Sequence, residues 1–258
     1  LQHVPRSHNY PGFAEGTTGP SLLQALRDQV ERYDVEMLPA QADSISVSGQ
    51  GFRVGWNGGE AEARCVLLAT GATDIPPDMP YAAEALRDGA LRYCPVCDGY
   101  EAIDQAIGVL TNATAGIREA LYVRHFSARV TVFLAGQEVV LSEAERSQLS
   151  EASVDIAAGP VESVRFWNGR VTVRHGGRET ICDTVYSALG MRIHSELALR
   201  LGAAADPSGY LQVDAHQQTS IPGLYAAGDV ASGLNQISVA FGGAAIAASA
   251  IHSSLLGR

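Results

Sequence analysis

Residues 105–135 decide the fold, because two strand patterns enclose a helix pattern: QAIGVLT (105–111), AGIREALYVRHF (115–126) and RVTVFLA (129–135). Two apolar runs separated by an amphipathic segment are the signature of a βαβ unit. Such a unit predicts a parallel sheet covered by helices, and therefore an α/β protein. SEAERSQLS (142–150), which opens with a serine and an acidic turn, predicts a further capped helix.

Two loop-like stretches flank this region. ATDIPPDMP (72–80) contains three prolines, and MRIHSE (191–196) interrupts the pattern further along the chain. We expect two Rossmann-like, three-layer domains, with residues 79–191 inserted into a discontinuous domain of residues 1–78 and 192–258. Hairpin turns are predicted at WNGR (167–170) and HGGR (175–178). Further helix or strand patterns lie at 21–33, 43–48, 51–56, 63–71, 181–190, 209–214 and about 236–256.

Composition excludes several classes of partner. The chain has 258 residues and a net charge of −10, with no run of lysine or arginine, which argues against nucleic acid and anionic membrane surfaces. AAIAASAI (244–251), the longest mildly apolar stretch, is too short to span a membrane, so we expect no membrane association. Four cysteines in a chain of this length do not make a disulfide scaffold, and we therefore expect a cytoplasmic protein.

The motif YCPVCDGYE (93–101) carries the chemistry. Cys94 and Cys97 have the spacing that closes a disulfide across one helical turn. Pro95 then falls at the first helical position, where its fixed φ fits and no N–H is needed. The helix N-terminus favours a thiolate, and Asp98 is placed to move protons when the disulfide opens. We therefore expect a working dithiol.

Two other interpretations of this motif are weaker. A zinc site needs four ligands, usually as two pairs, but Cys65 and Cys182 are isolated in predicted strands and no histidine pair has ligand spacing. We therefore expect no metal. A purely structural disulfide does not suit a reducing cytoplasm. Cys65 and Cys182 are expected to be buried packing residues.

A second motif, TSIPGLYAAGDV (219–230), indicates a cofactor. A short apolar strand runs into Gly228 and Asp229. Glycine lets a cofactor approach the backbone, and the aspartate can accept a hydrogen bond from a sugar or ribityl hydroxyl. Alone, a Gly-Asp pair after a strand is weak evidence for a cofactor site. Together with LLATG (67–71) and the two cysteines it becomes strong evidence.

The ordered motifs resemble the low-molecular-weight thioredoxin reductase family of FAD-dependent pyridine nucleotide–disulfide oxidoreductases. The resemblance implies that Cys94 attacks the partner, that Cys97 faces the flavin and that Asp98 is the acid/base. The implied partner is a thioredoxin-like protein disulfide or a small-molecule dithiol, and the implied assembly is a homodimer. The FAD residues that it implies are Thr70, Gly71, Gly228, Asp229, Gln236 and Ile237. The motifs are NYPGF (9–13), LLATGA (67–72), YCPVCDGYE (93–101), IREALYV (117–123), YSALG (186–190), TSIPGLYAAGDV (219–230) and NQISVAFGGAAIAA (235–248).

Two departures from the family pattern matter. The family begins with a strand and a GxGxxG turn, roughly 30 residues or more that this sequence lacks, and we expect a truncation rather than a protein without normal FAD affinity. The second nucleotide turn reads GVLTNATAG (108–116), and FLAGQE (133–138) lacks the basic residues that bind the NADPH 2′-phosphate, while Glu138 adds negative charge. The NADPH site is therefore expected to be degenerate. The residues found where glycines are expected are Thr111, Asn112 and Ala113.

The electron donor or acceptor stays open between NADPH, ferredoxin and oxygen. Relatives that oxidise dithiols pass electrons through FAD to oxygen. An acidic ferredoxin would be repelled by the charge of −10 unless a basic patch exists, for which Arg118, Arg124 and Arg129 are the clustered candidates. A non-catalytic relative that keeps the fold but binds no FAD is a further alternative, against which the intact CPVCD motif argues.

Overall fold

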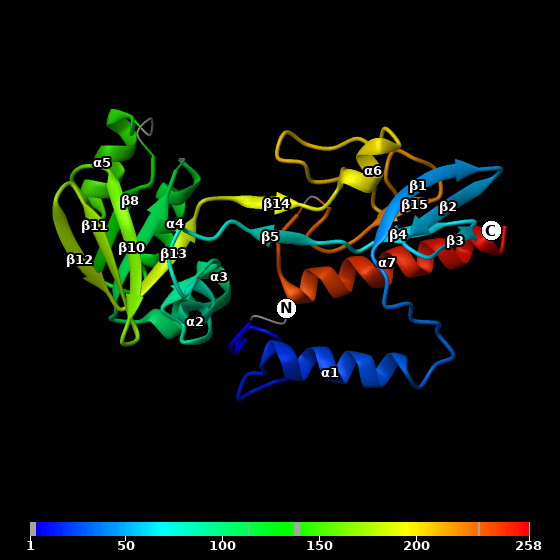
Figure 1. Ribbon diagram of the computed structural model, residues 1–258, viewed down its shortest axis with the longest axis horizontal. Coiled ribbons are helices and arrows are strands. Elements are labelled where there is room, and N and C mark those ends of the chain that lie inside the picture. The colour runs from blue at the N-terminus through cyan, green and yellow to red at the C-terminus, as the bar shows by residue number, and fades with distance from the viewer. Residues whose placement is uncertain (1–3, 113, 137–139, 232, 258) are drawn as a thin grey trace. The chain divides into compact units, whose positions relative to one another are not determined.

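The computed structural model describes the whole chain except residues 1–3, 113, 137–139, 232 and 258. It divides into two compact units, of which the first comprises residues 1–33 and 74–190 and the second residues 34–73 and 191–258. Figure 1 shows the elements of both units. The predicted α/β class is confirmed, whereas the predicted grouping of residues 1–78 with 192–258 stays a prediction.

A five-stranded parallel sheet forms the centre of the first unit. Its order is β6, β13, β7, β8 and β9, and each neighbouring pair is parallel. The expected βαβ unit is confirmed, because α4 (Ala115–Val123) connects β7 to β8 as a parallel crossover requires. The strands are β6 (Leu91–Arg92), β7 (Ala106–Thr111), β8 (Arg129–Leu134), β9 (Asp155–Ile156) and β13 (Thr184–Ala188).

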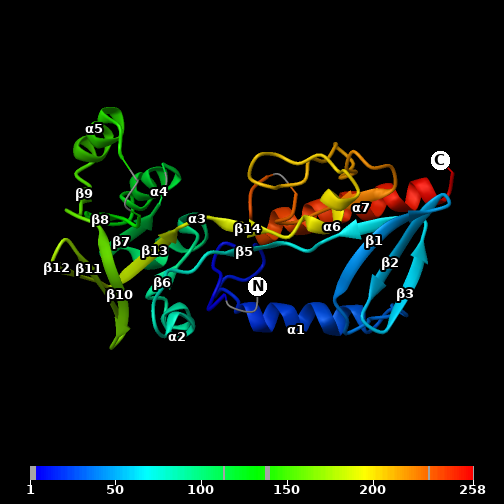
Figure 2. The ribbon, with the colours of Figure 1, turned by 45° about the horizontal axis from the view of Figure 1, so that its top comes forward.

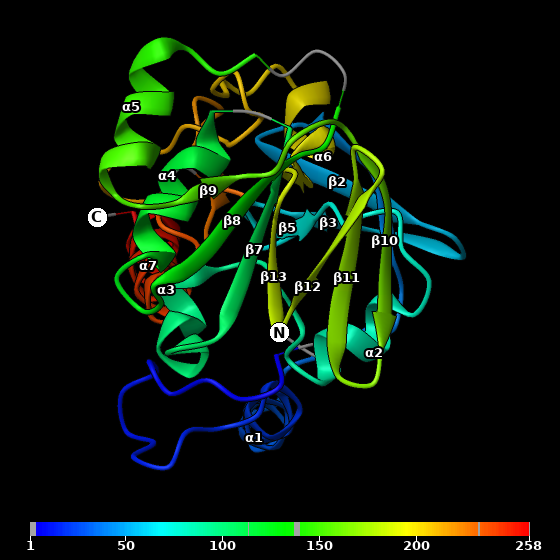
Figure 3. The same ribbon diagram turned by 90° about the vertical axis from the view of Figure 1, so that its left-hand side faces the viewer.

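Each face of this sheet buries a separate core. Successive side chains of a strand point to opposite faces, so Val109 lies in one core and Leu110 in the other. The first core is covered by α4 and α5 (Glu143–Glu151), and α5 begins with the predicted cap at Ser142. The second is covered by α2 (Ala82–Arg87) and a meander of strands. Figure 3 shows α4 and the meander on opposite sides of β7, β8 and β13.

The meander consists of β10 (Val161–Trp167), β11 (Arg170–His175) and β12 (Arg178–Cys182), paired antiparallel. Both predicted hairpin turns are confirmed. Their central residues, Asn168–Gly169 and Gly176–Gly177, have the positive φ that tight hairpins need. The single strand predicted over 181–190 is wrong, because the chain leaves the meander at Asp183 and enters the parallel sheet. The Asp183 carboxylate accepts a hydrogen bond from the Ala106 N–H (2.9 Å) at that corner.

The first unit also contains α1 (Gly19–Val30), which the Thr18 side chain caps by accepting from the Ser21 N–H. This helix ends three residues before the predicted end, at residue 33. Leu22 is its buried anchor, and Tyr33 lies beyond the helix and is exposed. After β6 come two short helices, α3 (Pro95–Asp98) and η1 (Gly99–Ala102).

The second unit is built from three small sheets around one core that includes Phe52, Leu68 and Leu224. Figure 2 shows the antiparallel sheet of β1, β2 and β3 with its strands side by side, in blue. In the second sheet β15 pairs parallel with β4, and β14 and β5 form the third. The strands are β1 (Ala42–Ser48), β2 (Gly51–Trp56), β3 (Gly59–Ala63), β4 (Val66–Leu68), β5 (Ala72–Asp74), β14 (Met191–Ile193) and β15 (Leu224–Ala226).

Two expectations for the second unit are wrong. The continuous strand predicted over 63–71 breaks after Ala63, because the chain passes there from one sheet to another, and Cys65 is consequently half-buried rather than buried. The strand predicted over 209–214 is irregular, with Leu211 in isolated bridges, although this side chain is fully buried. The helices of the unit are α6 (Glu196–Arg200) and α7 (Ile237–Leu255).

Among the described helices, α7 is long and apolar enough to cross a membrane by length and composition alone. Core helices of soluble proteins pass the same test. The side chains of α7 are mostly not buried within the chain. The expectation that the protein does not associate with membranes stays a prediction.

Candidate active site

A disulfide joins Cys94 and Cys97 in the first unit, with their Cα atoms 5.2 Å apart. Cys94 is the N-cap of α3 and Pro95 its first residue, as the spacing predicts. The Cys94 sulfur accepts a hydrogen bond from the Cys97 N–H (3.2 Å). An N–H that already points at this sulfur would stabilise it as a thiolate after reduction. Both cysteines are half-buried, so the pair is within reach of a partner.

Asp98 is held by two side chains from neighbouring strands. Arg92 Nη1 lies 3.0 Å from Asp98 Oδ2, and the Tyr186 hydroxyl donates to Asp98 Oδ1 (2.9 Å). In the parallel pairing of β13 with β6, Tyr186 lies opposite Arg92, which brings both groups to the same carboxylate. Burial raises the pKa of Asp98, and Arg92 and Tyr186 only partly oppose this. The sequence did not reveal these partners, because Tyr186 is 88 positions away along the chain and Arg92, although only six positions away, lies outside the cysteine motif.

The candidate cofactor residues of the second unit meet at one edge of a sheet. Thr70 and Gly71 follow β4, and Gly228 and Asp229 follow β15. These strands are parallel, so their carboxyl ends coincide, and the Ala227 N–H donates to the Leu68 carbonyl (3.0 Å) there. Both glycines have positive φ. Such an edge is where open α/β sheets bind ligands.

The remaining candidates lie at the start of α7. Gln236 is its N-cap and Ile237 its first residue, and both are half-buried. A helix of this length presents N–H groups and a positive dipole end to a ligand. Asp229 is also half-buried, and burial raises the pKa of its carboxyl. A carboxyl of this kind can accept a hydrogen bond from a hydroxyl group.

The turn between β7 and α4 differs from a turn that binds a dinucleotide. The segment 111–116 has the spacing of GxGxxG, with Thr111 at the first glycine and Gly116 at the third. Thr111 is fully buried, and a Cβ on Gly116 would lie 2.2 Å from the Thr111 Cβ. Gly116 therefore makes room for the threonine. Asn112 Nδ2 donates to the Leu189 carbonyl (3.4 Å), and Ala113 lies outside the described residues.

The carboxylate of Glu145 is a second feature that distinguishes this turn from one that binds a dinucleotide. Hydrogen bonds from the Ser142 hydroxyl and N–H, and from the Thr114 hydroxyl, lower the pKa of Glu145 and keep it ionised beside the turn. The expectation for Glu138 concerns a residue outside the described part of the chain. Arg146 of α5, to which no sequence motif points, lines an open hollow of about 530 Å³ beside the ends of β8 and β9.

Residues 11–244 match the family described as pyridine nucleotide-disulphide oxidoreductase. The chain belongs to this family. A thioredoxin reductase of Mycolicibacterium smegmatis is 29% identical over 258 residues, which cover 96% of this chain and 82% of that protein. The structure of HlmI superposes with a TM-score of 0.90 at 28% identity, covering 99% of this chain and 81% of that one. The structure of thioredoxin reductase from Streptococcus pyogenes MGAS5005 superposes with a TM-score of 0.90 at 27% identity, covering 100% of this chain and 87% of that one.

This pyridine nucleotide-disulphide oxidoreductase is therefore an enzyme of the oxidoreductase class, and its resemblance to thioredoxin reductases is confirmed. The disulfide distance between Cys94 and Cys97 fits the redox-active dithiol of such an enzyme. Within the described residues, no group of three or more histidine, cysteine, aspartate or glutamate side chains is arranged to hold a metal ion.

Proposed function

We propose that the protein exchanges electrons between FAD, the Cys94–Cys97 pair and the disulfide or dithiol of a partner. The observation that carries this proposal is a half-exposed disulfide on the first turn of a helix, with the half-buried Asp98 beside it. The partner is a thioredoxin-like protein disulfide, as the names of the relatives suggest, or a small-molecule dithiol. We further propose a cytoplasmic homodimer.

The exchange itself needs only the two cysteines and the partner. In the reducing direction the Cys94 thiolate attacks one partner sulfur, the partner disulfide breaks, and a mixed disulfide forms. Cys97 then attacks the Cys94 sulfur, which breaks the mixed disulfide, releases the partner sulfur held in it as a thiol and restores the Cys94–Cys97 disulfide. Two electrons and two protons move to the partner. Dithiol oxidation is the same sequence in reverse.

Asp98 holds the proton for this exchange. Its carboxyl has a raised pKa because it is buried, so it keeps a proton to a higher pH than an exposed aspartate. It can then donate to a departing thiolate and take the proton back in the reverse direction. The Tyr186 hydroxyl and the Arg92 guanidinium fix the carboxyl in place.

FAD fits the residues of the second unit at its flavin and ribityl end. The two positive-φ glycines give close backbone approach, and a Cβ on Gly71 would meet no atom within 4 Å, so that face is open. We assign the ribityl hydroxyls to Asp229 and the flavin ring edge to Gln236 and Ile237. When bound, FAD supplies the two-electron exchange with the cysteine pair.

NADPH does not fit the first unit well. Thr111 fills the space against Gly116, and ionised Glu145 lies beside the turn where a diphosphate would bind. Among the described residues that line the hollow at the end of β8, Arg146 is the one cation. This mismatch favours a second candidate, the oxidation of a small-molecule dithiol. In that reaction dithiol and oxygen become disulfide and hydrogen peroxide.

The decisive experiment mixes FAD-loaded protein anaerobically with either NADPH or dithiothreitol and follows the bleaching of flavin absorbance. We expect bleaching with dithiothreitol but slow or absent bleaching with NADPH. Cys97→Ser should lose the dithiothreitol response, while Cys65→Ser serves as the matched cysteine control and should keep it. Lack of bleaching by dithiothreitol would refute the exchange site. Rapid bleaching by NADPH would show that the turn binds the dinucleotide after all.

A further inference from the structure

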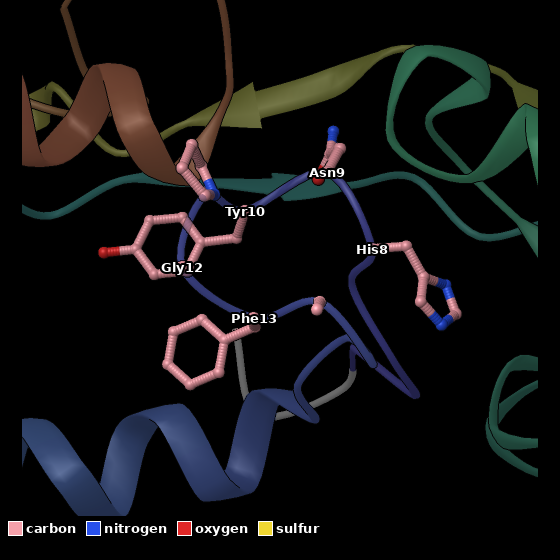
Figure 4. Close-up of a pocket in the computed structure, with 7 residues that line it drawn as sticks. His8, Asn9, Tyr10, Gly12 and Phe13 are labelled. Atoms are coloured by element: carbon pink, nitrogen blue, oxygen red, sulfur yellow. The ribbon is translucent and has the colours of Figure 1, made fainter.

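The loop of residues 7–17 is a closed, anchored structure in the first unit. Ser7 and Thr17 exchange backbone hydrogen bonds of 2.7 and 2.9 Å, and both residues are buried. The rim of the loop lines an open hollow of about 460 Å³. Figure 4 shows the His8 ring pointing away from the stacked rings of Tyr10 and Phe13. His8 is therefore presented on the other side of the loop.

The position of the His8 ring is determined by a glycine. Gly16 has φ +70°, and a Cβ there would lie 2.5 Å from His8 Cδ2. The ring thus lies directly over Gly16, where no side chain fits. From this place His8 Nδ1 pairs with Glu101 Oε1 of η1. Asn9 Nδ2 adds a long hydrogen bond of 3.5 Å to the Val96 carbonyl of α3.

Glu101 connects this pair to the acid of the active site. It follows Asp98 by three residues, and its charge acts on both Asp98 and Tyr186. Its second oxygen, Oε2, is buried, and no hydrogen-bond partner for it exists among the described residues. His8 is therefore the partner that offsets a poorly solvated carboxylate. The charged or titratable groups around Asp98 are Arg92, Glu101, Tyr186 and, through Glu101, His8.

We propose that the His8–Glu101 pair is a charge-setting element for Asp98, which positions the loop of residues 7–17 on the redox helix and tunes proton transfer there. This inference rests on the proposed function, since it assumes that Asp98 moves the proton. Glu101 and His8 are positioning residues, because they pair with each other and act on Asp98 through the charge of Glu101.

The two members of the pair act on Asp98 with opposite sign. The Glu101 carboxylate favours the protonated form of Asp98, so Glu101→Gln should lower the pH at which Asp98 titrates. In the acid range an imidazole carries a proton and offsets Glu101, so His8→Asn should raise that pH. A purely structural role predicts the same direction for both variants, because each weakens the same contact.

The test measures Asp98 directly in the full chain with its disulfide intact. Infrared difference spectra across pH give the midpoint of the protonated carboxyl band, and Asp98→Asn identifies that band by its loss. We expect shifts of about 0.3–0.7 pH unit, the scale of a partly exposed charge pair. The matched controls are Glu84→Gln and His125→Asn, which make the same chemical changes at exposed sites elsewhere in the first unit.

Opposite shifts in Glu101→Gln and His8→Asn, both larger than in the controls, support the proposal. Shifts in one direction, or shifts no larger than in the controls, overturn it. The pH dependence of disulfide reduction by dithiothreitol is a second measurement, and there the two shifts should vanish in an Asp98→Asn background. If Asp98 titrates as expected while dithiothreitol reduces the disulfide without any effect of Asp98→Asn, the proposed proton role fails and the charge coupling stands.

Discussion

Glu119 of α4 offers a test of the electrostatics of the first unit that does not depend on any cofactor. Its Oε2 is buried and has no hydrogen-bond partner among the described residues. Burial, together with the charge of Asp74, raises the pKa of its carboxyl to about 7, and Arg118 only partly opposes this. The perturbation is Glu119→Gln, which replaces the carboxyl with a permanently neutral group of the same shape.

The sign and size of the change in stability follow from the linkage between protonation of Glu119 and folding. Because the folded-state pKa is raised above 4.5, the stability that the bound proton contributes is complete below pH 4.5 and is lost as pH rises through about 7. If the whole shift of the Glu119 pKa, from 4.5 to about 7, is converted at about 1.36 kcal/mol per pKa unit, it corresponds to roughly 3.4 kcal/mol in the free energy of unfolding. The side chain is partly solvated, which reduces this to about 1–2 kcal/mol. Glu119→Gln should therefore stabilise the protein at pH 8 by this amount and have little effect at pH 5.

Urea unfolding of both forms at pH 5 and pH 8 measures this difference. Glu84→Gln, at an exposed carboxylate on α2, is the matched control and should change stability by less than about 0.5 kcal/mol at either pH. An equal gain at both pH values would mean that Glu119→Gln acts through packing or helix propensity. No gain at pH 8 would mean that Glu119 titrates like an exposed carboxyl, and either result refutes the argument.

Three further predictions concern single sites. Gly116→Ala should destabilise the protein by about 1–3 kcal/mol through its contact with Thr111, and a second change, Thr111→Gly, should restore part of the loss in thermal unfolding. Tyr186→Phe removes a hydrogen bond to the Asp98 carboxylate and should raise its titration midpoint in infrared spectra. Thiol counting in the native protein should rise by two on mild reduction, while Cys182 stays unreactive because burial raises its pKa to about 12.

Local periodicity predicted much of the first unit, because the information lies within short segments. The βαβ unit and both hairpins depend on neighbouring residues, and the structure confirms them. Periodicity failed at Cys65 and Asp183, where an apolar run continues while the chain changes sheets. An apolar run indicates burial, but it does not say in which sheet a residue is buried. The sheet in which a residue is buried is decided by the strands with which its segment pairs.

The same limit applies to the candidate active site. The spacing of Cys94 and Cys97 predicted their disulfide, since both residues belong to one turn. The partners of Asp98 depend instead on strand register: Tyr186 lies opposite Arg92 only because β13 and β6 pair in that register. His8 reaches Glu101 across 93 positions of sequence. Contacts of this kind form only in the tertiary fold, and no local motif predicts them.

The turn at residues 111–116 shows that the packing role and the phosphate role of such a turn can be considered separately. In a dinucleotide-binding turn the first two glycines allow a tight turn and close approach to the pyrophosphate, and the third allows the helix to pack closely on the strand. Here the third, Gly116, is present, and a Cβ there would lie 2.2 Å from the Thr111 side chain. The packing role is therefore still required. The phosphate role is separable, because it depends on backbone N–H groups that a ligand must reach and not on the packing of Gly116 against Thr111. The close packing of α4 on β7 therefore constrains Gly116 whether or not a dinucleotide binds at this turn.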